Sequence, residues 1–361
     1  MTQVKRLQKI MKEKGIEGIL LSSTLNQRYI TGFNYDDGYV VVLQDKAFLQ
    51  TDFRYVEAAN ATVNHEDFEV VTPNISHLKY VAQIAAENGI GTMLVEESAL
   101  SLEYFSHFEK AAEGKVKYLG GASAILTEMR MVKTEEELSN MAEAQRITDA
   151  AFSHIISVLH PEMTEVDVAL ELEFFMRKNG AERTSFDTIS VSGTASSMPH
   201  GVPRNLKLER GFLTMDFGCV YNGYCSDMTR TVVLGKADEE IKKVYYTVLE
   251  AQTKALEAAA NGERGCYRLD EIARDIINGA GYEGRFGHSL GHGVGMFIHE
   301  SPRLAPGIDR GARLVSGNVV TFEPGIYIPE KYGCRIEDMA AITDDGIRNF
   351  TKSTKELIEL F

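Results

Sequence analysis

Two apolar, β-rich runs on either side of Asn222-Gly223 constrain the fold of this chain more than any other feature. Asn-Gly is the dipeptide that most strongly favours a two-residue hairpin turn. With that turn, Asp216 pairs with Thr229, and Asp227 lies diagonally across from Asp216 on the same face of the ribbon. Diagonal neighbours lie roughly 7–8 Å apart at Cα, with their side chains closer. The hairpin therefore suits two carboxylates that grip a metal pair spaced about 3.5–4 Å.

A glycine-rich run downstream holds three of the nine histidines within twelve residues: His288, His292 and His299. Histidine is a neutral ligand for divalent metals and a proton carrier near pH 7. Further on, Glu323 and Glu337 each lie in an apolar, strand-like run. A carboxylate in such a run is costly to bury without a partner, and a cation is the obvious one.

The charges of these residues fit a pair of metal ions. Asp216, Asp227, Glu323 and Glu337 carry four negative charges, which two divalent ions balance, and His292 adds a neutral ligand. This donor set suits Mn²⁺, Co²⁺, Fe²⁺ or Zn²⁺ and is unlike the thiolate shell of a structural zinc. Each acid alone is more often a helix cap or a salt-bridge partner, and a lone histidine is usually a core residue. Their occurrence together, in this order, predicts a dinuclear hydrolase site.

The motifs resemble those of the pita-bread metallopeptidases, in particular Xaa-Pro aminopeptidases and Xaa-Pro dipeptidases (prolidases). The matching segments span most of residues 187–345 and are Pro199-His200-Gly201, the aspartate hairpin, His288 to Glu300, Phe322-Glu323-Pro324-Gly325 and Arg335-Ile336-Glu337-Asp338. Residues 26–33 and 51–55 resemble the creatinase-like N-terminal domain of the same enzymes. As a set these motifs are highly specific, although each alone is not.

The expected fold class is α/β (α+β) with two domains. Residues 1–124 alternate helical and strand patterns, which predicts a small α/β domain, and the resemblance identifies it as creatinase-like. Gly120-Gly121-Ala122-Ser123 reads as a linker, and residues 125–361 then form the pita-bread catalytic domain. A capping box at residues 134–137 starts a helix that runs to about residue 159. Further helices are expected at 164–178, at 238–260 and, in short form, at the C-terminus.

The resemblance also implies a role for each site residue. Asp216 binds one metal, His292 and Glu323 bind the other, and Asp227 and Glu337 bridge both. A hydroxide between the metals attacks the carbonyl before proline, and Glu323 accepts or shuttles its proton. His200 and His299 are implied to bind substrate and to stabilise the tetrahedral intermediate, and His288 is implied to be a pocket or supporting residue. Arg335 and Asp338 are implied to orient the ligands. Arg303 resembles the prolidase arginine that binds a dipeptide's C-terminal carboxylate.

The implied cofactors are two divalent metal ions per subunit, Mn²⁺ or Co²⁺ first, with Zn²⁺ or Fe²⁺ also compatible. The implied substrate is a peptide with proline in second position, and family habit implies a homodimer. A net charge of −14 makes nucleic acid and anionic membranes poor partners. No apolar run is long enough to span a bilayer, and four cysteines without a CxxC pair favour a reducing, cytoplasmic setting.

Several alternatives stay open at this level. Arg303 favours a dipeptidase, but arginine also occurs there in homologues that trim longer peptides. Asp36 and Asp37 are expected on a loop between two strands of the N-terminal domain, which family dimers can present to the neighbouring subunit's site. They depart from the Gly/Ser-rich pattern common in this loop, which leaves open how the amino terminus of the substrate is recognised. A methionine aminopeptidase shares the metal set but normally lacks the front domain, and creatinase shares the architecture but lacks the ligands. A catalytically inactive binding relative is the alternative from a different class.

Overall fold

The computed structural model describes residues 1–361, which divide into two compact units, Met1–Met129 and Arg130–Phe361. The expected boundary after residue 124 falls inside helix α6 (Ala122–Met131), so the expected linker is partly helical. Buried Ile125 and Leu126 lie on this helix, and the Tyr29 hydroxyl donates to the Met129 carbonyl at 3.1 Å. These contacts hold most of α6 to the first unit, which therefore extends beyond the expected boundary.

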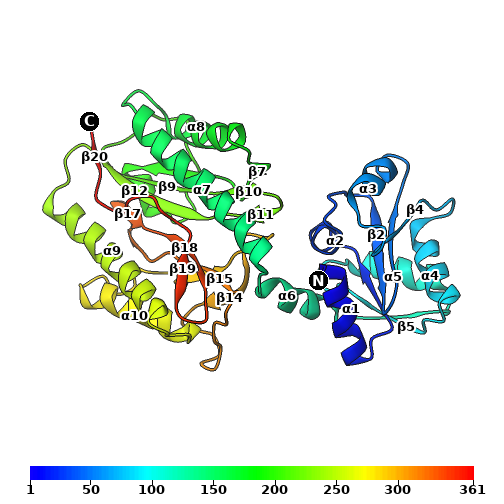
Figure 1. Ribbon diagram of the computed structural model, residues 1–361. Coiled ribbons are helices and arrows are strands. Elements are labelled where there is room, and N and C mark those ends of the chain that lie inside the picture. The colour runs from blue at the N-terminus through cyan, green and yellow to red at the C-terminus, as the bar shows by residue number, and fades with distance from the viewer. The chain divides into compact units, whose positions relative to one another are not determined.

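The first unit is built on one mixed sheet with the strand order β4-β3-β2-β1-β5-β6 (Figure 1). Strand β1 pairs antiparallel with β2 and parallel with β5, which makes the sheet mixed. The elements are α1 (Gln3–Lys14), β1 (Gly18–Leu21), α2 (Thr24–Thr31), β2 (Gly38–Leu43), β3 (Ala47–Thr51), α3 (Val56–Thr62), β4 (Glu69–Val71), α4 (His77–Glu87), β5 (Thr92–Val95), α5 (Leu102–Ala112), β6 (Lys117–Leu119) and α6.

The second unit contains four long helices: α7 (Glu135–Val158), α8 (Glu165–Lys178), α9 (Glu239–Ala260) and α10 (Cys266–Gly279). The predicted capping box is present, because Thr134 Oγ1 accepts from the Glu137 backbone and the Glu137 carboxylate accepts from the Thr134 backbone. Helices α8 and α9 also match their predicted ranges. Helix α10 was not predicted, since Gly265 at its N-cap offers no side-chain acceptor.

The strands of the second unit form four small sheets with the orders β11-β10-β7, β20-β12-β9-β8, β14-β13-β15-β18-β19 and β16-β17. Their bounds are β7 (Arg183–Thr184), β8 (Ile189–Ser192), β9 (Gly211–Phe217), β10 (Cys219–Tyr221), β11 (Tyr224–Cys225), β12 (Met228–Leu234), β13 (Gly291–Gly293), β14 (Glu300–Leu304), β15 (Val319–Phe322), β16 (Gly325–Ile328), β17 (Tyr332–Arg335), β18 (Asp338–Ile342), β19 (Ile347–Asn349) and β20 (Glu359–Leu360), with a short 3₁₀ helix η1 (Gly193–Ser197) after β8.

Helices α7 and α8 lie on one side of the strands and α9 and α10 on the other (Figure 1), and each pair packs on its own hydrophobic core. In one core, Phe152 of α7 and Leu172 of α8 pack with Phe217 of β9. In the other, Val248 of α9 and Leu269 of α10 pack with strands β15 and β18. The predicted short C-terminal helix is wrong: the last residues form strand β20, which pairs parallel with β12. None of the helices combines the length and apolarity that a bilayer crossing requires.

Candidate active site

The predicted hairpin is present with its predicted register. Asn222 and Gly223 form the turn with φ of +46° and +85°, and Asp216 pairs with Thr229. The same hairpin passes from the β9–β12 sheet into the β10–β11 sheet, and Asp227 lies outside the strands at this crossing. Gly218 makes the crossing possible, because a Cβ there would lie 2.0 Å from the Ser226 carbonyl oxygen. Asp227 therefore belongs to the hairpin but lies outside the regular pairing of its strands.

The other candidate ligands lie in the β13–β18 half of the unit. His292 is on β13, Glu323 directly follows β15, and Glu337 lies between β17 and β18. Gly291 permits the close approach of β13 to β15, since a Cβ there would lie 1.9 Å from the Thr321 carbonyl oxygen. Strand ends from two sheets thus direct acidic and imidazole groups toward one another.

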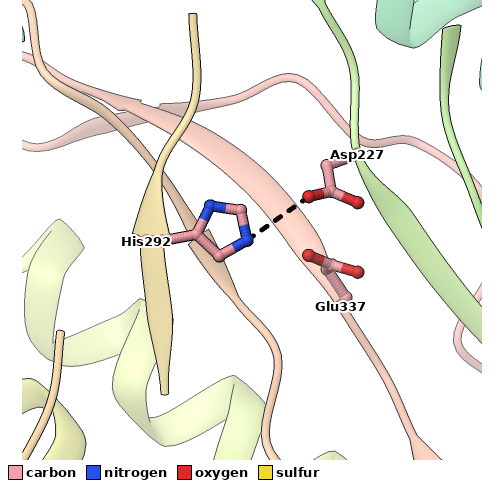
Figure 2. A group of neighbouring side chains, drawn as sticks. All are labelled: Asp227, His292 and Glu337. Carbon is pink, nitrogen blue, oxygen red and sulfur yellow. Dashed lines mark ion pairs between the residues drawn. The ribbon is translucent and has the colours of Figure 1, made fainter. Parts of the chain in front are cut away.

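Three of these side chains form a tight group, shown in Figure 2. One ligand atom each from Asp227, His292 and Glu337 lies within 4.8 Å of the others. His292 Nε2 is 3.6 Å from Asp227 Oδ2 and 3.3 Å from Glu323 Oε1. Asp216 lines the same cavity of about 600 Å³ as these four residues, but it is not part of the tight group. Its Oδ2 instead accepts a hydrogen bond from Arg335 Nη2 at 2.7 Å.

The protonation preferences of the group point to a cation. Burial, and then the neighbouring carboxylates, raise the pKa of Asp227 and of Glu337 well above the ordinary range. Burial raises the pKa of Glu323 to about 8, and burial lowers the pKa of His292 to about 4. Crowded carboxylates beside a neutral imidazole are costly in a buried site unless protons or a positive ion compensate them.

Hydrogen bonding leaves the imidazole lone pair directed at the carboxylates. His292 Nδ1 lies 3.0 Å from the Gly293 carbonyl, an acceptor, so Nδ1 carries the proton and Nε2 faces Asp227 and Glu323 as an acceptor. Asp216 Oδ1 is buried and accepts no hydrogen bond. Carboxylate oxygens that converge with an imidazole lone pair form the ligand set of a hard or borderline divalent ion, so these residues fit the metal that the motifs imply.

Two threonines that the sequence analysis missed hold the acids in place. Thr229 Oγ1 donates to Glu337 Oε2 at 2.7 Å and accepts from Arg335 Nε at 3.0 Å. Thr321 Oγ1 donates to Glu323 Oε1 at 3.1 Å and accepts from the His292 backbone N–H at 3.1 Å. Thr321 lies two residues from Glu323, so strand alternation was a usable signal for this pair, whereas Thr229 and Glu337 are brought together only by the fold.

A chain of hydrogen bonds runs outward from Asp216. Arg335 Nη1 donates to the Tyr327 hydroxyl at 2.6 Å, and that hydroxyl lies 2.9 Å from His288 Nε2. His288 Nδ1 faces the Ser289 carbonyl at 2.9 Å, so its proton is there and Nε2 accepts from Tyr327. Burial lowers the pKa of His288 to about 3, which keeps the ring neutral. His288 lines the cavity, whereas the sequence offered no sign of the role of Tyr327.

Asp338, expected to orient a ligand, turns away from the cavity. Its carboxylate accepts from Arg230 Nη2 at 2.8 Å and from Lys355 Nζ at 2.8 Å. Arg230 Nη1 in turn donates to the Glu337 backbone carbonyl at 2.6 Å. Asp338 therefore reaches the site only through Arg230 and the backbone beside Glu337.

The rest of the cavity is lined by polar groups and an apolar wall. His200, His299 and Arg303 all line it, and the His299 ring contacts the His292 ring with centroids 4.5 Å apart. Burial lowers the pKa of His299, which keeps it neutral near pH 7. Phe186, Ile189 and Ile298 contribute apolar surface that the sequence analysis did not identify. The cavity thus joins a candidate metal centre to hydrogen-bond donors and an apolar surface.

Comparisons with known proteins agree with this geometry. Residues 139–344 match metallopeptidase family M24, and residues 3–132 match the creatinase/prolidase N-terminal domain. A Xaa-Pro dipeptidase of Pyrococcus furiosus is 36% identical, with 99% of each chain covered. The solved structure of a Xaa-Pro dipeptidase from Bacillus anthracis superposes with a TM-score of 0.92 at 41% identity over 99% of each chain. An X-Pro aminopeptidase from Thermotoga maritima gives 0.89 at 34% identity, over 96% of this chain and 98% of that one. The chain has the creatinase-type front domain and the pita-bread catalytic domain, and it belongs to metallopeptidase family M24.

Proposed function

We propose that this chain is a metal-dependent exopeptidase that hydrolyses the bond between an N-terminal residue and proline, with Xaa-Pro dipeptides as the preferred substrates. The observation that carries the proposal is the convergence of Asp227, His292 and Glu337, with Glu323 and Asp216 beside them, at one cavity. The names of the relatives, Xaa-Pro dipeptidase and X-Pro aminopeptidase, support the proline specificity.

The proposed ligands are Asp216, Asp227, His292, Glu323 and Glu337, which would hold two divalent ions, with Mn²⁺ or Co²⁺ first and Zn²⁺ or Fe²⁺ also compatible. Bound there, the ions supply Lewis acidity toward a water molecule and the scissile carbonyl. Arg335, fixed by Asp216 and by the Tyr327 hydroxyl, keeps Asp216 oriented toward this centre.

Three side chains carry the proposed proton and charge steps. The Glu323 carboxylate, held at Oε1 by Thr321, accepts the proton of the attacking water and returns it to the proline nitrogen as that nitrogen leaves. His200 and His299 donate hydrogen bonds to the oxygen of the tetrahedral intermediate. Phe186, Ile189 and Ile298 give the cavity that holds these groups an apolar wall.

Arg303 favours dipeptides over longer peptides. This exposed guanidinium lines the cavity and forms no ion pair in the structure. A carboxylate is its natural ligand, and a dipeptide places its C-terminal carboxylate directly on the proline. The second candidate, an aminopeptidase acting on longer peptides, is supported by the similarity to the Thermotoga maritima enzyme.

The wider setting follows from the same proposal. We infer a homodimer from the family resemblance. A cytoplasmic location is supported by the four cysteines, which are all free and buried, as expected in a reducing compartment.

The test is hydrolysis of Ala-Pro, Ala-Pro-Ala and Met-Ala-Ala after chelation and readdition of Mn²⁺, Co²⁺ or Zn²⁺. Cleavage of Ala-Pro, lost with chelator and restored by metal, supports the dipeptidase. Cleavage of Ala-Pro-Ala identifies the aminopeptidase and leaves Arg303 without the proposed role. Activity on Met-Ala-Ala alone, or on none of the three, refutes proline specificity.

A further inference from the structure

Two exposed charged side chains of the cavity have no ion-pair partner. Asp187 and Arg303 are both exposed, both line the cavity, and neither forms a hydrogen bond or ion pair in the structure. Asp187 is also the one carboxylate of the cavity lining that lies outside the proposed ligand set. A free carboxylate at the mouth of a substrate cavity is available to a cationic part of the substrate.

The two free charges belong to different walls. Asp187 lies just before β8, where Ile189 pairs with Asp216 in the β20-β12-β9-β8 sheet. Arg303 lies on β14, where it pairs with His292 in the other large sheet. The candidate metal ligands lie where these sheets meet. A substrate whose carboxylate is bound by Arg303 therefore extends its other end toward the wall that carries Asp187.

We propose that Asp187 makes this enzyme selective for a basic residue, lysine or arginine, before the proline. This inference rests on the proposed function and adds the substrate class to it. Phe186 and Ile189, on either side of Asp187 in the sequence, give this wall apolar surface. A lysine or arginine side chain lays its methylene stem along apolar surface and keeps its charged end in water, where Asp187 is exposed.

The geometry assigns Asp187 to the side chain rather than to the α-ammonium group. The α-ammonium nitrogen is bonded to the Cα next to the scissile carbonyl, so it stays close to the reaction centre at the buried carboxylates. The ammonium group of a lysine side chain is separated from the Cα by four methylene groups, so it reaches the exposed rim of the cavity. Among the lining carboxylates, only Asp187 occupies such an exposed position.

The test compares kcat/KM for Lys-Pro, norleucyl-Pro and Glu-Pro in the wild-type holoenzyme and in Asp187→Asn. Norleucine matches the lysine stem without its charge. The same series as Xaa-Pro-Ala covers an aminopeptidase. Asp344→Asn is the matched control, because Asp344 is an exposed acid of the same unit that lies outside the cavity and has no ion-pair partner.

We expect Asp187→Asn to lower the Lys-Pro to norleucyl-Pro ratio about two- to fivefold, the size of an exposed ion pair, and Asp187→Lys to favour Glu-Pro. The wild-type preference should shrink as salt rises, and Asp344→Asn should leave every ratio unchanged. An equal loss on all three substrates assigns Asp187 to the α-ammonium and overturns the inference, as does an unchanged ratio. If the wild type cleaves none of the substrates, the proposed function falls as well, whereas norleucyl-Pro cleavage with unchanged ratios removes only the selectivity.

Discussion

A buried charge cluster behind His299 yields the sharpest prediction about stability. Glu300, whose side chain is 3% exposed, accepts from Arg130 Nε at 3.1 Å and from Lys133 Nζ at 3.5 Å. It also accepts from the Phe297 backbone N–H at 3.1 Å, within the loop that leads to His299. Gly295 leaves room for this carboxylate, because a Cβ there would lie 2.5 Å from Glu300 Oε2. Glu300 therefore connects the segment before α7 to the loop that carries a proposed catalytic histidine.

Glu300→Gln keeps the shape but removes the charge. Breaking a buried ion pair from one side costs about 3–5 kcal/mol. The lower value applies here, because the amide still accepts from the Phe297 N–H and because Glu137 also acts on the Lys133 charge. A loss of about 3 kcal/mol corresponds to a decrease of about 6–12 °C in the melting temperature of a domain of this size.

The assay is calorimetric melting of the wild type, Glu300→Gln, Lys133→Met and the double variant. The double variant should recover much of the loss, since no unpaired lysine charge is then buried. Burial lowers the pKa of Lys133 and Glu300 opposes that effect, so removing Glu300 lowers this pKa further. The folded variant then binds fewer protons than its unfolded chain. Its loss of stability relative to the wild type should therefore shrink as pH rises above 7. A loss below about 1 kcal/mol, or losses that simply add in the double variant, would refute the reasoning.

Three further predictions concern the supports of the site. Thr229→Val should weaken Mn²⁺ binding about 10–100-fold in calorimetry, because Glu337 loses its donor; unchanged affinity contradicts this. Gly291→Ala should lower the melting temperature and the soluble yield, because its Cβ meets the Thr321 carbonyl oxygen, while Gly287→Ala, with open space, should match the wild type; equal behaviour would refute the close-approach explanation. Burial raises the pKa of Glu165, but hydrogen bonds from Arg204 and Ser192 outweigh it and leave this pKa lowered. Glu165→Gln should therefore lower the free energy of unfolding in urea titrations at pH 7, and this loss should fade as pH drops below about 4. A loss independent of pH would contradict the role given to the Glu165 charge.

Local chemistry made several elements predictable from sequence. The Asn222-Gly223 turn set the register that pairs Asp216 with Thr229, and the capping box set the start of α7. Both depend on residues within one turn or one ribbon, so neighbouring side chains suffice to specify them. The five proposed ligands, chosen from sequence motifs, all line one cavity, and their role as ligands stays a prediction.

Predictions that depended on distant partners were less successful. The C-terminal residues have a helical pattern but form β20, because Val233 and Gly235 donate to the backbone carbonyls of Ile358 and Leu360. Asp338 follows a proposed ligand in sequence, yet its carboxylate forms an ion pair with Arg230, which is more than a hundred residues away in the chain. Asp187 belongs to none of the sequence motifs, and only the tertiary structure places it, without a partner, in the cavity lining.

The sequence by itself determined the turn, the starts of helices α7, α8 and α9, the list of acidic and histidine groups and the resemblance to a metallopeptidase family. The tertiary structure alone decided which hydroxyls and guanidinium groups hold those acids, as when Thr229 meets Glu337 and Arg335 meets Asp216. The physical reason is burial. A charge excluded from water must be compensated by whatever donor the packing brings within about 3 Å, and that donor is chosen by the pairing of strands that lie far apart in the chain.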